Sequence, residues 1–269
     1  MNRANTAKLI ERILRNAGEI LVRHFGKISN VRRKEHPSSV VCAADLASEA
    51  YLVGELRKHF PQDSIITEES GFLPGESEFT WVIDPLDGTS NYVSNLPWFG
   101  VQLGRLREGV PILTAIFVPL GKCYYVAQTG QGLYRNGKRV TVAAERKLER
   151  VLCAFGLDPS ANDRQSRRNF ERMRRIAQGV RNIRSTNSLI DFCYTLEGRF
   201  GACVNLHTKI WDIVPVALML PEAGGKLTDL EGAPIVFDLG AATFGRSYAV
   251  LGASRALHPQ LLALARGRR

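Results

Sequence analysis

The sequence changes character near residue 145, and this change limits the possible folds more than any other feature does. Before it, strand-like runs follow one another from about Phe99 to Val142, with turn signals such as Asn136-Gly137 between them. After it, predicted helices and strands alternate. The polar stretch Glu145 to Glu149 is the predicted boundary between two halves, 1-145 and 146-269. We therefore predict an α+β fold in which an antiparallel, helix-covered first half joins an alternating second half.

Two helices are predicted ahead of these strands. Apolar residues recur at three- and four-residue steps from Leu9 to Phe25, which is the spacing of one helix face. Asp45 is the predicted N-cap of a second helix, which must stop at Pro61 because proline disfavours helical backbone in the residue before it. Two short strands are predicted next, Ser64 to Thr67 and Phe79 to Ile83, and each runs directly into acidic residues.

Composition places the chain among globular proteins. Of its 269 residues, 45% are hydrophobic and 23% are charged, which are ordinary values for a folded domain. Its apolar stretches are far shorter than the roughly 18 to 20 residues of a membrane helix, and the N-terminus lacks the pattern of a secretory signal. Five cysteines without a C-x-x-C pair indicate buried free thiols rather than disulfides or a zinc site. We therefore expect a cytoplasmic protein with no membrane contact.

The charge of the chain is strongly positive and unevenly distributed. Lys and Arg number 36 against 26 Asp and Glu, which gives a net charge of +10. Between Asp163 and Arg184, eight arginines stand against two acids. Such a field attracts anions, either small phosphates or nucleic acid, although a solvated helix face has the same composition. Phe170 is the one aromatic residue in the basic helix from Arg164 to Arg175, so a stacking surface for single-stranded nucleic acid is not favoured.

Acidic residues lie at three places where a predicted strand gives way to a loop or helix. Glu68 ends the run SIITEES, Asp84 and Asp87 lie in WVIDPLDGTSNY, and Asp212 starts a helix predicted from about Ile213. Carboxylates at strand ends can be held rigidly around one crevice, and their mutual repulsion is costly unless a cation neutralises it. Hard oxygen ligands favour Mg²⁺, and no set of His and Cys residues has zinc spacing. The pattern therefore predicts a magnesium site.

The segment DPLDGT combines metal ligands with groups that bind phosphate. Pro85 is expected to stop the strand, so that the two aspartates turn toward one centre instead of alternating between faces. The backbone carbonyl of Leu86 is a further candidate ligand. Gly88 lets the backbone approach a ligand, and a helix that begins near Thr89 presents free amides to an anion. The Thr89 hydroxyl can also orient a water.

Three motifs in this order, TEES, WVIDPLDGTSNY and WDIVPVALMLPEAGG, resemble those of the inositol monophosphatase family, the Mg²⁺-dependent, lithium-sensitive sugar and nucleotide phosphatases. The resemblance extends from about Lys34 to Tyr248. It implies a layered α-β-α-β-α sugar-phosphatase fold with the active site between the two halves. It also implies binding of Mg²⁺, as two or three ions per active site, inhibition by lithium and assembly as a homodimer.

The resemblance also assigns roles by position. A metal-activated water would attack the phosphate without a covalent nucleophile, and a pair of metal ions would clamp the in-line displacement. The matched metal ligands are Glu68, Asp84, the Leu86 carbonyl, Asp87 and Asp212. The matched catalytic residues, which orient and activate the water, are Glu68, Thr89 and Asp45. The matched substrate-binding residues are Lys34, Asp87, Gly88, Thr89, Thr186, Asn187, Ser188, Asn205 and Asp212.

The choice of substrate depends on positions where this sequence departs from the family. Asn205 stands where inositol-hydrolysing members usually have an acid, and an amide hydrogen-bonds a hydroxyl without charge assistance. The loop Thr186 to Ser188 is more polar and bulkier than the family's usual Gly-Ser segment. We expect hydrolysis of inositol 1-phosphate or a similar small polyol phosphate. The alternatives are 3'-phosphoadenosine 5'-phosphate, fructose 1,6-bisphosphate, NADP and histidinol phosphate, or an RNA- or transcription-complex-binding protein with residual phosphatase activity.

Overall fold

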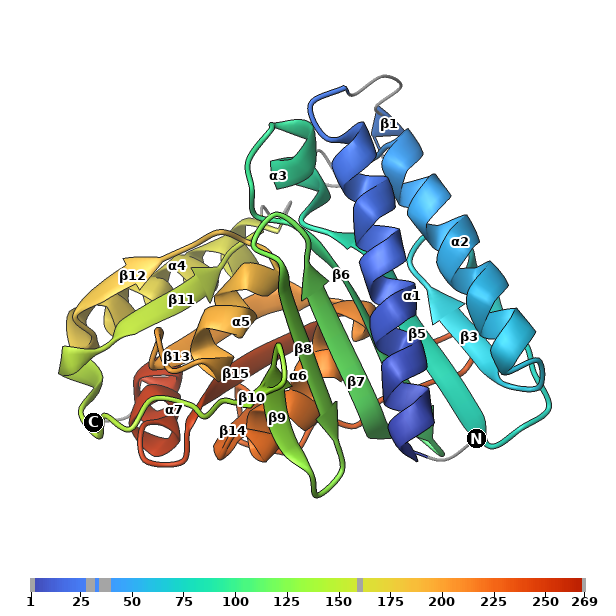
Figure 1. The fold of residues 1–269 in the computed structure, drawn as a ribbon. Helices are drawn as coiled ribbons and strands as arrows, with labels where there is room; N and C mark the ends of the chain where they lie inside the picture. Colours follow the sequence, from blue (N-terminus) through green and yellow to red (C-terminus); the bar gives the residue numbers. More distant parts are fainter. Residues whose placement is uncertain (1–2, 28–31, 34–39, 159–161, 268–269) are drawn as a thin grey trace.

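The chain forms two large β-sheets that stack between three layers of helices (Figure 1). The computed structural model describes residues 3–27, 32–33, 40–158 and 162–267. The helices are α1 (Arg3–His24), α2 (Ala43–His59), α3 (Thr89–Val93), η1 (Leu148–Arg150), α4 (Asp163–Gly179), α5 (Leu189–Leu196), α6 (Ile210–Glu222) and α7 (His258–Arg266). The layers are α1 with α2, an eight-stranded sheet, α5 with α6, a five-stranded sheet, and α4 with α7. This α-β-α-β-α arrangement confirms the predicted fold class.

The eight-stranded sheet lies wholly within the first half of the chain. Its strands are β3 (Ser64–Thr67), β4 (Gly71–Leu73), β5 (Phe79–Asp87), β6 (Gly100–Arg107), β7 (Val110–Val118), β8 (Cys123–Gln128), β9 (Gly132–Arg135) and β10 (Lys138–Arg139). They follow the order β10-β9-β8-β7-β6-β5-β3-β4, with antiparallel neighbours except for the parallel pair β3 and β5. A separate two-stranded sheet pairs β1 (Arg32–Arg33) with β2 (Val40–Val41).

Alternate residues of β5 show that this sheet is covered on both faces. Trp81 and Ile83 are buried in the core with α1 and α2, whereas Val82 is buried in the core with α5 and α6. Successive side chains of a strand point to opposite faces, so a sheet between two helical layers requires continuous apolar runs. The apolar run WVI in β5 meets this requirement.

The five-stranded sheet follows the order β12-β11-β13-β15-β14. Its strands are β11 (Leu152–Gly156), β12 (Asn182–Arg184), β13 (Ala202–Thr208), β14 (Gly225–Asp229) and β15 (Tyr248–Ser254). The pairs β11–β12 and β11–β13 are parallel, and β15 is antiparallel to both its neighbours. Ala154 packs with α5 and α6, whereas Cys153 and Phe155 pack with α4 and α7. The two helix pairs therefore cover opposite faces of this sheet.

Two helices begin earlier than the sequence predicts, and both contain a candidate site residue. α2 begins at Ala43, so the predicted N-cap Asp45 is instead its third residue, and Cys42 is the N-cap. The Asp45 carboxylate accepts a hydrogen bond from the Cys42 amide at 2.8 Å, which satisfies a backbone donor at the helix start. α6 begins at Ile210, so Asp212 lies inside its first turn.

The predicted boundary at residue 145 falls between the two large sheets, because the first ends at Arg139 and the second begins at Leu152. Both sheets contribute to the core around α5 and α6, so the division into domains 1-145 and 146-269 stays a prediction. All five cysteines are free and buried, as predicted. Among the described helices, none is long and apolar enough to cross a membrane.

Candidate active site

An irregularity in β5 decides where Asp84 and Asp87 point. Asp84 is opposite Gln102 of β6 and Asp87 is opposite Gly100, so β5 takes three steps where β6 takes two. Residues three apart in a regular strand point to opposite faces, and the extra residue of a β-bulge returns both aspartates to one side. The prediction that Pro85 stops the strand is wrong, because a proline at a bulge need not donate a ladder hydrogen bond.

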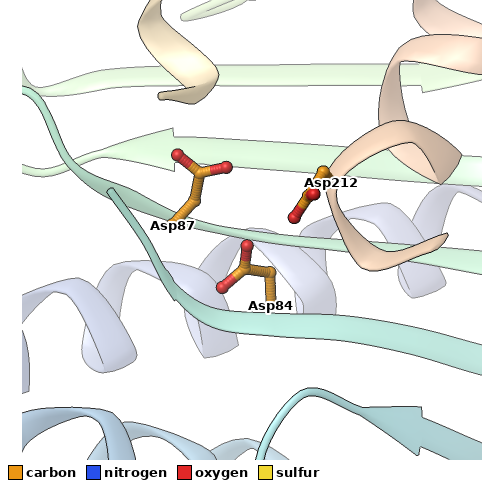
Figure 2. Close-up of side chains that lie close together, drawn as sticks. All are labelled: Asp84, Asp87 and Asp212. Carbon is orange, nitrogen blue, oxygen red and sulfur yellow. The ribbon is translucent and has the colours of Figure 1, made fainter. Parts of the chain in front are cut away.

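Three aspartates meet next to this bulge. Carboxylate oxygens of Asp84, Asp87 and Asp212 all lie within 4.8 Å of one another. Figure 2 shows Asp84 and Asp87 on β5 and Asp212 on the first turn of α6, with their carboxylates turned toward a common centre. Asp212 Oδ2 also accepts a hydrogen bond of 2.6 Å from the Lys209 amide. The structure therefore brings together two of the three acidic positions that the sequence singles out.

Burial and mutual repulsion raise the pKa of each of these carboxyl groups. Asp84 is 1% exposed, and desolvation, followed by the charges of Glu68 and of the other two aspartates, raises its pKa well above the usual value. Burial raises the pKa of Asp87 to about 7, although a hydrogen bond from the Leu189 amide acts in the opposite direction. Burial also raises the pKa of Asp212, with the charge of Asp87 as the next cause. Three such groups within 4.8 Å of one another favour a bound cation.

The donor set fits Mg²⁺ on its chemistry. The three ligand atoms are hard carboxylate oxygens, and no His or Cys of the described ranges belongs to the cluster. Glu68, the third predicted acidic position, lies in the turn after β3, and its charge raises the pKa of all three aspartates. The Leu86 carbonyl, which is the remaining predicted ligand, accepts a hydrogen bond from Thr89 Oγ1 at 2.9 Å.

Asp45 and Thr89 form a hydrogen-bonded pair at the bulge. Thr89 Oγ1 lies 3.2 Å from Asp45 Oδ1. The other oxygen of Asp45 accepts from both the amide and the thiol of Cys42, each at 2.8 Å. Burial raises the pKa of Asp45, opposed by these hydrogen bonds. The carboxylate is therefore fixed on one side by Cys42 and presents its second oxygen to the Thr89 hydroxyl.

Gly88 connects the bulge to α3 and is required by its surroundings. Its φ is +83°, and a Cβ at this position would lie 2.4 Å from the Trp98 carbonyl oxygen and 3.2 Å from Ser188 Cβ. Gly88 is the N-cap of α3 and Thr89 is the first helical residue, as predicted. Lys34, the other residue predicted to lie near the phosphate, is outside the described residues.

Glu49 anchors the turn that carries Glu68, and the sequence did not reveal it as a site residue. This carboxylate is 4% exposed on α2 and accepts hydrogen bonds from Thr67 Oγ1 at 2.6 Å and from the Glu69 amide at 3.0 Å. Ser70 Oγ donates to its other oxygen. The only sequence signal is the position of Glu49 one helical turn after Asp45.

A second buried carboxylate that the sequence did not reveal holds the predicted substrate loop. Asp191 accepts hydrogen bonds from the amides of Thr186 at 3.0 Å and Asn187 at 3.1 Å. Ser188 is the N-cap of α5, and its hydroxyl lies 2.9 Å from that of Thr186. Asn91 Nδ2 donates to the Thr186 carbonyl at 2.8 Å, which ties the loop to α3. The signal that was available is the spacing of Ser188 and Asp191, which is typical of a helix start.

The substrate loop meets Asn205 at Gly156, the last residue of β11. A Cβ on Gly156 would lie 2.8 Å from Asn205 Cγ and 3.0 Å from Asn187 Oδ1, so these two predicted residues are close together. Asn187 Nδ2 donates to Asp158 Oδ1 at 2.9 Å, and the charge of Asp158 contributes to the raised pKa of Asp212. Asp158 is thus another site residue missing from the sequence prediction. Like the acids that were found, it follows an apolar run, VLCAFGL.

Comparisons with known proteins show which family the chain belongs to. The model of the inositol monophosphatase family matches residues 2–268. A protein of Aquifex aeolicus named fructose-1,6-bisphosphatase/inositol-1-monophosphatase is 32% identical over 252 residues, which cover 93% of this chain and 90% of that protein. A protein of Xylella fastidiosa named Nus factor SuhB is 32% identical over 226 residues, which cover 81% of this chain and 80% of that protein. The crystal structure of the extragenic suppressor protein suhB from Bartonella henselae matches with a TM-score of 0.88 and 27% identity, and covers 97% of this chain and 98% of that one. The chain described here belongs to the inositol monophosphatase family.

Proposed function

We propose that the protein is a Mg²⁺-dependent phosphomonoesterase that hydrolyses inositol 1-phosphate or a similar small polyol phosphate. The observation that carries this proposal is the cluster of three buried aspartates beside the hydrogen-bonded pair Asp45 and Thr89. Two or three Mg²⁺ ions would be held by Glu68, Asp84, the Leu86 carbonyl, Asp87 and Asp212. When bound, Mg²⁺ supplies Lewis-acid activation of water and neutralises the charge of the phosphate.

The side chains around the bulge would prepare the attacking water. Asp45 holds the Thr89 hydroxyl, whose oxygen can accept a hydrogen bond from that water. The raised pKa of Asp45 suits a group that takes the proton released by the water, through Thr89. Glu68 would orient the same water from the turn after β3. The water oxygen then forms its bond to phosphorus as the ester P–O bond breaks on the opposite side. The leaving oxygen takes a proton from solvent and departs as the alcohol, and Asp45 returns its proton to solvent.

The start of α3 would hold the phosphate during this displacement. The amides of Gly88 and Thr89 are at the N-terminus of that helix, and amides in such positions can donate to oxygens that gain charge in the transition state. The close approach of the backbone at Gly88 requires a glycine, as its contacts with Trp98 and Ser188 show. No side-chain nucleophile is needed for this reaction.

The alcohol part of the substrate would lie against Asn205, Asn187 and Asp158. Their amide and carboxylate groups can donate to and accept from several hydroxyls, which suits a polyol. Asp158 would supply the charged acceptor that Asn205 lacks in comparison with other family members. The name of the Aquifex aeolicus relative, which refers to a sugar bisphosphate and an inositol phosphate, supports the same substrate class.

Phosphate release from a panel of substrates tests the proposal. The panel is inositol 1-phosphate, fructose 1,6-bisphosphate, 3'-phosphoadenosine 5'-phosphate, NADP and histidinol phosphate, compared by kcat/KM with Mg²⁺ and with EDTA. We expect Mg²⁺-dependent release with inositol 1-phosphate preferred, and preference for another member would select one of the alternative substrates. No release from any member would contradict the proposal and favour an RNA- or transcription-complex-binding protein.

The variant Asp158→Asn tests the assignment of the polyol side. It should lower kcat/KM for inositol 1-phosphate by about tenfold, because a charge-assisted hydrogen bond to a hydroxyl is lost. Release from p-nitrophenyl phosphate, which has no hydroxyls, is the matched control and should change little. Equal losses with both substrates would contradict a role in polyol recognition.

A further inference from the structure

A strongly basic cavity lies in the outer helical layer, where α4 contacts α7. Its volume is about 480 Å³. Six arginines line it: Arg164, Arg167, Arg168, Arg172, Arg175 and Arg266. Glu171 and Glu231 are the acidic residues of the lining, so its net charge is +4. This is the region that the sequence marks by its excess of arginine.

Two of the arginines build the walls of the cavity. Arg175 donates to two carbonyl oxygens at the end of α7, at 2.9 and 3.0 Å, and pairs with Glu171 at 3.3 Å. Arg266 donates to the Leu230 carbonyl at 3.3 Å and pairs with Glu231 at the same distance. These bonds tie α4, α7 and the segment after β14 together, so the cavity is a fixed part of the fold.

Three other arginines form a row along α4 without comparable partners. Arg164, Arg168 and Arg172 are spaced by four residues, so they follow one another on one face of the helix. For the part of the chain that the structure describes, none of the three has a side-chain hydrogen bond or an ion pair within 4 Å. Burial, followed by the charge of Arg175, lowers the pKa of Arg172, and Glu231 offsets this only in part. An anion between these side chains would remove the repulsion.

The cavity is separate from the acidic cluster. α4 and α7 pack on the face of the five-stranded sheet that is opposite to α5 and α6 (Figure 1). Asp212 belongs to α6, on the other face of that sheet. None of the lining residues belongs to the proposed active site.

We propose that this cavity binds a compact anion with two or more adjacent phosphate groups, such as the phosphate chain of a nucleotide or of inorganic polyphosphate. Its volume falls within the roughly 300–1,000 Å³ of small-molecule sites. A guanidinium group can donate two parallel hydrogen bonds to one phosphate, and a short phosphate chain can reach several of the arginines in the row. A single orthophosphate reaches fewer of them.

The cavity favours a compact anion over a nucleic-acid strand. Among the residues that the structure describes, no aromatic side chain lines it, so bases would have no surface on which to stack. Phe170 is exposed on α4, but it lies two residues from both Arg168 and Arg172, which places it on the opposite side of the helix. The positive charge instead lines a cavity whose volume suits a molecule of nucleotide size.

Calorimetric titration of the metal-free protein with sodium tripolyphosphate tests the proposal. EDTA keeps the phosphate chain from binding through Mg²⁺ at the acidic cluster, and the ionic strength is held constant because arginine–phosphate contacts are screened by salt. We expect one saturable site, with orthophosphate bound about tenfold more weakly or worse. A triple variant should bind tripolyphosphate about tenfold more weakly or worse. It carries Arg164→Gln, Arg168→Gln and Arg172→Gln. Equal affinity for ATP would assign recognition to the phosphate chain alone, and tighter binding of ATP would identify a nucleotide as the ligand.

A matched control variant carries Arg150→Gln, Arg181→Gln and Arg255→Gln. These arginines are exposed and do not line the cavity, and the control has the same net charge as the first variant. Unchanged binding by the control is expected, whereas an equal loss in both variants would show a general effect of charge and overturn the proposal. Absence of saturable binding by the unmodified protein would also overturn it. A short RNA that binds more tightly than tripolyphosphate through the same arginines would replace it with the nucleic-acid alternative.

The single variant Arg168→Gln keeps the test decisive if the triple variant is unstable. Arg168 is exposed on α4 and has no side-chain hydrogen bond in the described structure, so the fold does not depend on it. Its loss should weaken tripolyphosphate binding by about threefold or more. Unchanged affinity in this folded variant would contradict the proposal.

Discussion

The backbone amide of Leu189 donates a hydrogen bond of 2.6 Å to Asp87 Oδ1, and this contact joins the two halves of the chain at the acidic cluster. Leu189 is the first residue of α5, whereas Asp87 is the last residue of β5. Asp87 Oδ2 accepts a second hydrogen bond from Gln102 Nε2 at 3.1 Å. The orientation of this carboxylate is therefore set from both sides of the predicted boundary, and it depends on how the two sheets pack together.

The metal-free protein should lose stability as the pH rises toward 7. The pKa of Asp87 is raised from 3.8 to about 7, so between these values the folded state holds a proton that the unfolded state has released. This contribution to the free energy of unfolding is complete below the unfolded-state pKa, falls as the pH rises between the two values, and is gone above the folded-state pKa. Urea unfolding in EDTA from pH 4.5 to 8 should show wild type losing stability relative to Asp87→Asn up to about pH 7 and no further above it, by at most about 1.4 kcal/mol per pH unit. Saturating Mg²⁺ should abolish this loss, and a pH-independent difference in EDTA would contradict the prediction.

Asp212→Asn should preserve the fold and remove most of the turnover. The substitution keeps the size of the side chain and an oxygen that can accept from the Lys209 amide, but it removes one negative charge from the proposed metal site. We expect kcat/KM for phosphate release to fall by about a hundredfold or more, together with weaker Mg²⁺ binding measured by calorimetry. Asp163→Asn, an exposed position on α4 with the same change of charge, is the control. Rates near wild type at moderate Mg²⁺ would show that Asp212 has no such role.

Cys42→Ala should slow catalysis by loosening Asp45. The substitution removes the thiol that lies 2.8 Å from Asp45 Oδ2 and leaves the amide of the same residue in place. We expect kcat to fall by about three- to tenfold with little change in KM, which corresponds to the loss of one hydrogen bond. Cys42→Ser should restore most of the rate, because a hydroxyl can donate to the same oxygen. Cys203→Ala, another buried free cysteine, controls for the loss of a core thiol, and a serine variant as slow as the alanine variant would refute the idea.

Glu49→Ala should reduce both stability and metal affinity. It leaves the Thr67 hydroxyl and the Glu69 amide without their acceptor, and unsatisfied buried donors of this kind cost about 1–3 kcal/mol each. Because the same contacts hold the turn that carries Glu68, Mg²⁺ should bind more weakly as well. Urea unfolding and Mg²⁺ calorimetry measure the two effects. Glu49→Gln, which keeps an acceptor oxygen, should lose less of each, and Mg²⁺ affinity unchanged in the alanine variant would separate this turn from the metal site.

Local patterns in the sequence predict the mixed α+β fold and much of the site, whereas the layered α-β-α-β-α order is implied by the family resemblance. The sequence predicts Asp84, Asp87 and Asp212 as site residues because acids that follow apolar runs stand out in the chain. Their carboxylates come together once the fold brings β5 and the start of α6 together. Glu49 is not found because its hydrogen bonds reach a hydroxyl and an amide 18 and 20 residues away, and no local spacing encodes such bonds. Asp191 is not found because its spacing from Ser188 indicates only a helix start, and not that its carboxylate holds the substrate loop. The homodimer and the cytoplasmic location implied at the outset stay predictions.

The sequence predicts the starts of α2 and α6 too late. Asp45 and Asp212 each accept a hydrogen bond from the amide three residues earlier, so both lie inside the first turn of their helices instead of before it. Cys42 and Lys209, the residues at the N-cap positions, are not typical of such positions. Sequence rules that look for a capping side chain therefore place these two helix starts too late.

The bulge in β5 also releases two backbone carbonyls from the pairing of the sheet. The Pro85 carbonyl accepts from Ser48 Oγ at 2.8 Å, and the Leu86 carbonyl accepts from Thr89 Oγ1 at 2.9 Å. A regular strand with a single residue between its aspartates would also place both carboxylates on one face, because side chains two apart share a face. Such a strand would have no residue outside the ladder to supply an uncharged oxygen. The number of residues between Asp84 and Asp87, and not only the two acids, therefore sets how many charged and how many neutral oxygens a cation would meet.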